Sequence, residues 1–175
     1  MQLDLQVRAA LAASDAHRGQ RYGDKPYMSH LEDVVRTLKQ FGVKNEDVLA
    51  AGFLHDAIED TDMNYNDIRR ATNESVAEIV FAVTDELGRN RAERARNTYP
   101  KIRGYPQATA VKLADRIANV SNGHIERSGM VAKYMEEYGK FKEALFVVFD
   151  EHDFELNVIL AVTSMWQHLD RLMRK

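Results

Sequence analysis

The sequence predicts an all-α fold. Apolar residues recur at helical spacing along the chain, as Leu3, Val7, Ala10 and Leu11 do near the N-terminus. Only three prolines and nine glycines occur, and they fall at positions where helices would end. We see no alternation of apolar and polar residues, flanked by turn residues, of the kind that a β-hairpin requires. These observations favour a single bundle of helices.

The expected helices are joined by short connections. They cover residues 2–18, 29–42, 45–60, 73–87, 106–121, 128–149 and 153–173, with a short segment at 66–71 between the third and the fourth. Ser29 and Glu32 form a Ser-x-x-Glu capping box that opens the second helix, and Gly42 closes it. Pro106 suits the first turn of its helix, and Gly123 is expected to interrupt the chain behind it.

Length, charge and composition exclude several functions. The 175 residues fit one domain, with the chemistry at about 15–140 and a helical extension at about 141–175. A net charge of −3 gives no overall attraction to nucleic acid or to anionic membranes. No apolar run approaches the ~18 residues that would span a bilayer, and without cysteine there is no thiolate chemistry. We expect a cytoplasmic protein with no nucleic-acid or membrane partner, and a homo-oligomer is left open.

The richest chemistry lies in His-Asp-Ala-Ile-Glu-Asp-Thr at residues 55–61. Successive residues of a helix turn by about 100°, so Glu59, Asp56 and Asp60 would lie about 40°, 100° and 140° from His55. Three carboxylates at the C-terminal end of an apolar helix are disfavoured by the helix dipole and by desolvation. A bound cation would remove that cost, so the cluster indicates a metal-assisted active site.

Two further candidates are weak when each is taken alone. His30 begins its helix, where a lone histidine is more often a cap or a packing residue than a ligand. Asp115, taken with its own segment only, would pair with Arg116 or Lys112 on a solvated flank. Asn119 lies one helical turn after Asp115 and faces the same way.

Taken together, these residues suggest a reaction. Two imidazoles and two carboxylates form a nitrogen and oxygen ligand set suited to Mn²⁺, Fe²⁺ or Zn²⁺. Glu59 and Asp60 would be left to orient or deprotonate water and to protonate a leaving group. The expected reaction is metal-assisted hydrolysis of a phosphate ester or anhydride.

Four segments resemble the RelA/SpoT-type alarmone hydrolases, a branch of the HD-domain phosphohydrolases that includes small stand-alone members. Residues 55–61 resemble the motif HDxxEDT, 111–119 resemble KLADRxxN, 16–20 resemble AHxGQ, and 26–30 resemble PYxxH. The four occur in the family's order and at similar spacing.

This resemblance implies an HD-domain helical bundle that removes pyrophosphate from the 3′ position of ppGpp or pppGpp. It places Mn²⁺, or another divalent transition metal, on His30, His55, Asp56 and Asp115. It places the attacking water on Glu59 and Asp60. The nucleotide would contact Arg21, Asn119 and Tyr138, and its phosphates would lie near Arg89 and Arg91.

The chain departs from the family pattern in three places. Leu31 stands where proline is usual, and the loop between Gln20 and His30 is one residue shorter, with Tyr22 where a basic residue is common. The tail after about residue 145 matches nothing in the pattern. The loop leaves open another nucleotide substrate, such as a deoxynucleoside phosphate or NADPH. A non-catalytic nucleotide-sensing module is a further alternative, disfavoured because every ligand and both extra acids are present.

The stretch 89–105 is strongly basic and contains Pro100 and Gly104. We expect it to form a mobile, partly helical excursion. It is either a solvated loop that balances nearby acids or a flap whose arginines grip substrate phosphates.

Overall fold

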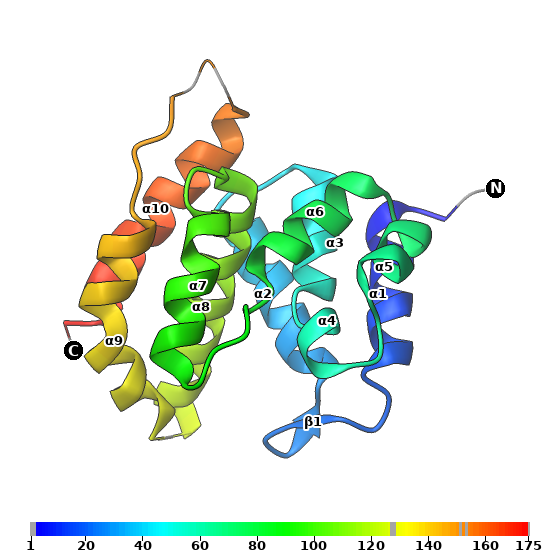
Figure 1. The fold of residues 1–175 in the computed structure, drawn as a ribbon, viewed down its shortest axis with the longest axis horizontal. Helices are drawn as coiled ribbons and strands as arrows, with labels where there is room; N and C mark the ends of the chain where they lie inside the picture. The colour runs from blue at the N-terminus through cyan, green and yellow to red at the C-terminus, as the bar shows by residue number, and fades with distance from the viewer. Residues whose placement is uncertain (1–2, 127–128, 151, 153, 175) are drawn as a thin grey trace.

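A computed structural model of the chain describes residues 3–126, 129–150, 152 and 154–174. They form a helical bundle with one short hairpin (Figure 1). The elements are α1 Leu5–Ala16, β1 Arg21–Tyr22, β2 Lys25–Pro26, α2 Met28–Gln40, α3 Glu46–Leu54, α4 Ala57–Asp60, α5 Tyr65–Ala71, α6 Glu74–Val83, α7 Arg91–Ile102, α8 Pro106–Glu126, α9 Met130–Leu145 and α10 Leu156–Leu172. The all-α prediction is confirmed.

Helices α2, α3 and α8 form the centre of the bundle. Helix α1 packs along α3 on one flank and α10 packs along α8 on the other (Figure 1). One buried core runs from Ala9 in α1 through Leu54 and Leu113 to Trp166 and Leu169 in α10. The C-terminal extension therefore shares the core of the motif-bearing part. No helix in the described ranges is long and apolar enough to cross a membrane.

Helices α2 and α3 approach each other closely at Gly52. A Cβ atom built on this glycine would lie 2.9 Å from Leu38 Cδ1 and 3.0 Å from Val35 Cγ2. Ordinary carbon contacts are about 3.5–4.0 Å. The missing side chain thus sets the spacing between the helix that carries His30 and the helix that ends at His55.

The expected helix over 45–60 is wrong as a continuous element. Helix α3 ends at Leu54, and α4 begins at Ala57 after a turn at His55 and Asp56. On one helix, neighbouring side chains would point about 100° apart. Both residues keep backbone angles of the α region, and their side chains meet, with His55 Nε2 3.0 Å from Asp56 Oδ2.

Several expected helix boundaries are also wrong. The helices expected to end at about 87 and 149 end at Val83 and Leu145. Helix α2 begins at Met28, before Ser29, whose hydroxyl donates to the Pro26 carbonyl at 2.8 Å instead of capping the helix. Helix α8 continues through Gly123 to Glu126. Gly123 is buried, and packing outweighs the ~1 kcal/mol that glycine costs inside a helix.

The basic stretch and the loop before α2 are more ordered than expected. Residues 91–102 form α7, with Pro100 inside the helix. Residues 21–26 form a hairpin in which Arg21 pairs with Pro26 and Tyr22 with Lys25. With two residues per strand, no alternation can develop in the sequence, and the hairpin was missed for that reason.

Candidate active site

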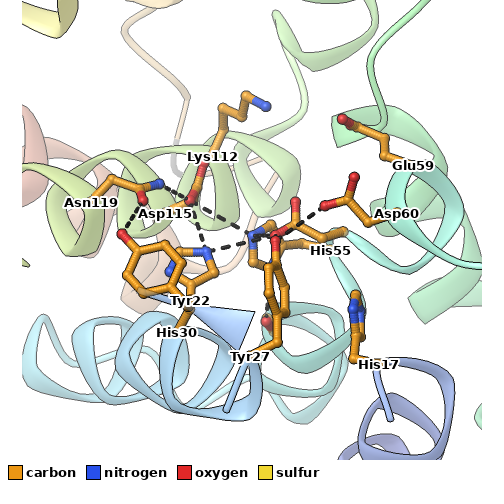
Figure 2. A network of polar contacts seen from close by, with 12 residues as sticks. His17, Tyr22, Tyr27, His30, His55, Glu59, Asp60, Lys112, Asp115 and Asn119 are labelled. Atoms are coloured by element: carbon orange, nitrogen blue, oxygen red, sulfur yellow. Dashed lines mark hydrogen bonds and ion pairs between the residues drawn. The ribbon is translucent and has the colours of Figure 1, made fainter. Parts of the chain in front are cut away.

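The four predicted metal ligands converge from three parts of the chain, and Figure 2 shows His30, His55 and Asp115 pointing toward one another. His30 comes from the first turn of α2, His55 and Asp56 from the turn between α3 and α4, and Asp115 from α8. His30 Nε2 lies 3.3 Å from Asp115 Oδ1 and 3.6 Å from Asp56 Oδ2. His55 Nε2 lies 3.0 Å from Asp56 Oδ2 and 3.7 Å from Asp115 Oδ1. Both imidazoles are buried.

The backbone turns His55 toward this cluster. Its Nδ1 lies 3.0 Å from the Gly52 carbonyl oxygen, which can only accept, so Nδ1 carries a proton. In the neutral ring Nε2 then offers its lone pair to the site. This is the arrangement of a metal-binding histidine, whose second nitrogen donates to a carbonyl or carboxylate.

The carboxylates control the charge of the imidazoles. Burial alone would lower the pKa of His55, but Asp56 and Asp115 outweigh it and raise that pKa well above the usual value. Burial would raise the pKa of Asp115, whereas hydrogen bonds and positive charge from His30 and His55 lower it well below the usual range. The cluster therefore holds a proton that a bound cation would displace.

These residues fit a divalent metal ion. Ligand atoms of His30, His55 and Asp56 all lie within 4.8 Å of one another. His55 Nε2 faces the carboxylate oxygens of Asp56 and Asp115, at 3.0 and 3.7 Å, so nitrogen and oxygen ligand atoms from three residues meet at one point. Two imidazoles with carboxylate oxygens suit Mn²⁺, Fe²⁺ or Zn²⁺.

Glu59 and Asp60 lie on α4, beside the ligand cluster, and both reach solvent (Figure 2). The backbone N–H of Asp85 donates to Glu59 Oε1 at 2.6 Å. Withdrawal from water raises the pKa of Glu59, and the charges of Asp85 and Asp56 add to this shift, against the opposing Lys112. Lys112 Nζ lies 4.0 Å from Asp85 Oδ1.

Of the predicted nucleotide contacts, Asn119 joins the cluster. Its amide donates to Asp115 Oδ1 at 2.5 Å, and its carbonyl oxygen accepts from the Tyr22 hydroxyl at 2.7 Å. The Tyr22 ring stacks on His30 with centroids 4.7 Å apart. Arg21 is exposed on the same hairpin and donates to the Asp24 carbonyl.

The other predicted contacts are engaged elsewhere. Arg89 binds Glu93, with Nε 2.9 Å from Oε2, and Arg91 binds Glu137, with Nε 2.8 Å from Oε1. The Tyr138 hydroxyl donates to Asp170 Oδ1 of α10 at 2.7 Å. Their roles toward a nucleotide stay predictions.

Comparison with known proteins identifies the family. Residues 9–137 match a family model described as HD domain. A Danio rerio relative, guanosine-3′,5′-bis(diphosphate) 3′-pyrophosphohydrolase MESH1, is 34% identical over 135 residues, which cover 72% of this chain and 73% of the relative. The chain belongs to the HD domain family. The family predicted from the motifs is thereby confirmed.

Other HD-domain relatives are longer, and a solved structure shares the fold. An Aquifex aeolicus 3′-pyrophosphohydrolase is 32% identical over 136 residues, which cover 74% of this chain and only 19% of that protein. The chain thus spans about a fifth of its length. The structure of a metazoan ortholog of SpoT, described as hydrolysing ppGpp, superposes with a TM-score of 0.74 at 23% identity. It covers 96% of this chain and 97% of that one.

Two residues at this HD-domain site were given no role from the sequence. From the sequence, Lys112 is expected only as a partner of Asp115, whereas in the structure the charges of Asp85, Glu59 and Asp56 act on it in addition to that of Asp115. In the sequence Tyr27 stands out only as part of the PYxxH segment, whereas in the structure its hydroxyl reaches both Asp56 and Asp60. Its position just before the helix that carries His30 is a signal that could have drawn attention to it.

Proposed function

We propose that this protein is a metal-dependent hydrolase that removes the 3′-pyrophosphate of ppGpp and pppGpp, leaving GDP and GTP. The observation that carries the proposal is that the candidate metal ligands and two further acids lie side by side around the turn at 55–56. His30, His55, Asp56 and Asp115 would supply the metal ligands, and Glu59 and Asp60 lie beside them as acids that ligation does not require. The MESH1 relative, which bears the name of this activity, supports the substrate.

The side chains can divide the chemistry as follows. A bound Mn²⁺ would polarise the phosphate and lower the pKa of water. Asp60 is placed to orient that water and accept its proton, since its carboxylate lies next to Asp56 through their shared partner Tyr27. Glu59, with its raised pKa, is suited to hold a proton for the leaving oxygen. Lys112 adds a positive charge on the same side.

Release of pyrophosphate tests this proposal. Purified protein, stripped with EDTA and reloaded with Mn²⁺, should convert ppGpp to GDP and pyrophosphate. Glu59→Gln and Asp60→Asn should each reduce kcat about 10²–10⁴-fold, the usual contribution of an acid or base. Asp62→Asn, at an exposed position two residues on, is the matched control and should be neutral. Full activity in Glu59→Gln and Asp60→Asn would refute the assignment.

The metal and the compartment are part of the proposal. The ligand set suits Mn²⁺, Fe²⁺ and Zn²⁺, and the resemblance to the alarmone hydrolases favours Mn²⁺, so activity should be compared after reloading with each ion. The absence of cysteine fits a reducing compartment such as the cytoplasm.

A different nucleotide is the second candidate, and Tyr22 favours it. This residue stands in the loop expected to meet the base, and it covers His30 and binds Asn119. A panel of ppGpp, deoxynucleoside phosphates and NADPH, assayed separately for phosphate and pyrophosphate, distinguishes the two. Tight nucleotide binding without turnover under any of the three metals would instead support a sensing module.

A further inference from the structure

Tyr27 connects a metal ligand to the acid proposed to serve the water. It stands at the N-cap of α2, three residues before His30. Its hydroxyl lies 2.7 Å from Asp56 Oδ2 and 3.1 Å from Asp60 Oδ2 (Figure 2). A phenol has one proton to donate. The two carboxylates therefore compete for it.

The Asp56 oxygen that accepts from Tyr27 is Oδ2, which also faces the two histidines of the site. Asp56 Oδ2 is 3.0 Å from His55 Nε2 and 3.6 Å from His30 Nε2. A cation held by these groups would take electron density from Asp56 Oδ2 and repel a proton pointed at it. Asp60 Oδ2, although further away, would then be the better acceptor for the Tyr27 hydroxyl.

The aromatic ring of Tyr27 is held so that its hydroxyl stays between these two acceptors. It stacks face to face on His17, with centroids 4.6 Å apart and an interplanar angle of 9°. His17 is buried, and its Nδ1 lies 2.8 Å from Gln20 Oε1. The Gln20 amide donates to the Asp60 carbonyl at 2.7 Å, so one frame holds both Tyr27 and Asp60.

The Tyr27 hydroxyl is the donor in both contacts, because an ionised carboxylate oxygen can only accept. The frame that holds it comes from the AHxGQ and PYxxH segments, whose His17, Gln20 and Tyr27 are not among the assigned metal ligands.

We propose that Tyr27 is a positioning residue whose hydroxyl donates to Asp56 in the metal-free protein and to Asp60 once the metal is bound. Metal binding thereby fixes the Asp60 carboxylate in place for the water. The catalytic consequence rests on the proposed function, whereas the exchange of acceptors depends only on metal binding.

Tyr27→Phe removes the oxygen and keeps the ring on His17. Calorimetric titration with Mn²⁺ should give a Kd equal to or lower than that of the wild type, because the variant has no bond to Asp56 to give up. If Tyr27 only supported Asp56 as a ligand in the metal-bound protein, its loss would raise the Kd for Mn²⁺ about 10–100-fold. That result would overturn the proposal. With ppGpp, kcat should fall about tenfold or more while KM stays within about twofold, since the contacts of Asn119 are untouched.

A spectroscopic measurement needs no substrate, so it separates failure of this proposal from failure of the proposed function. Adding Mn²⁺ to wild-type protein should produce a near-ultraviolet tyrosine difference spectrum, since the acceptor of one phenol changes. The signal should be lost in Tyr27→Phe and kept in Tyr65→Phe, where the same oxygen is removed from an exposed bond to Glu78. An unchanged signal in Tyr27→Phe would overturn the exchange.

Asp60→Asn provides a variant that keeps Tyr27, should Tyr27→Phe not fold. A neutral amide is a weaker acceptor than a carboxylate, so the Mn²⁺ difference spectrum should shrink or shift. In this background Tyr27→Phe should cause no further loss of kcat, because the two residues act as one unit. A difference spectrum identical to the wild type, or additive losses of kcat, would contradict the link between the two residues.

Discussion

Replacing Gly52 with alanine tests whether the spacing between α2 and α3 sets the metal site. The added Cβ would lie 2.9 Å from Leu38 Cδ1 and 3.0 Å from Val35 Cγ2. Leu38 is fully buried and Val35 is 3% exposed, so neither side chain has free space to move into. The helices must separate slightly, and His30 would move relative to His55.

The expected magnitude is the difference between two opposing effects. Alanine in place of glycine inside a helix gains about 1 kcal/mol. Overpacking a dense core costs about 1–3 kcal/mol. The net change for Gly52→Ala should therefore lie between about zero and 2 kcal/mol of destabilisation, by subtraction of these two ranges.

Gly139→Ala is the matched control. Gly139 lies exposed inside α9, and a Cβ there would meet none of the described atoms within 4 Å. It should show only the gain of about 1 kcal/mol. Urea denaturation of the metal-free proteins gives both free energies of unfolding. Calorimetry should show a raised Kd for Mn²⁺ in Gly52→Ala only. Equal stabilisation by the two substitutions, with equal Mn²⁺ affinity, would refute the reasoning.

Three further predictions follow from the same structure. Tyr22→Phe keeps the ring on His30 but loses the bond to Asn119, so KM for ppGpp should rise severalfold with kcat little changed, as steady-state kinetics would show. Asp170 accepts from Lys142 and Tyr138; burial alone would raise its pKa, but these bonds lower it below 3.8. The contribution of Asp170 to the free energy of unfolding is therefore present above that pH and is lost as the pH falls through the lowered pKa. Asp170→Asn should cost about 1 kcal/mol at neutral pH and flatten the acid side of the stability curve measured by urea titration. Removing Mn²⁺ with EDTA, from a concentration near 100 times its Kd, should remove about 2.7 kcal/mol of stability and lower Tm in a thermal melt.

The candidate site residues were accessible from the sequence because their chemical types and spacing are specific. The motif HDxxEDT predicted His55 and Asp56 as ligands, with Glu59 and Asp60 left over, and the structure brings the ligands together. The helices were equally accessible, since apolar periodicity reports directly which face is buried. Helix α6, with Ile79, begins within one residue of its expected start.

The local geometry of the site was not accessible, because interactions between distant segments determine it. Leu54, His55 and Asp56 carry no helix-breaking residue, so the pattern predicted a continuous helix. Arg116 was expected on a solvated flank, yet its guanidinium is buried between the rings of Tyr134 and Phe141, at 4.3 and 4.2 Å. Side-chain contacts across helices decided both outcomes.

The sequence by itself therefore determined the helical architecture, the set of candidate metal ligands and the presence of two further acids beside them, because each depends on residue type and local spacing. The tertiary structure alone decided that α3 ends before His55 and that the side chains of His55 and Asp56 meet. It also decided that Tyr27 lies between Asp56 and Asp60. Such placements depend on how α1, α2 and α4 pack together, and that packing has no signature in any one segment.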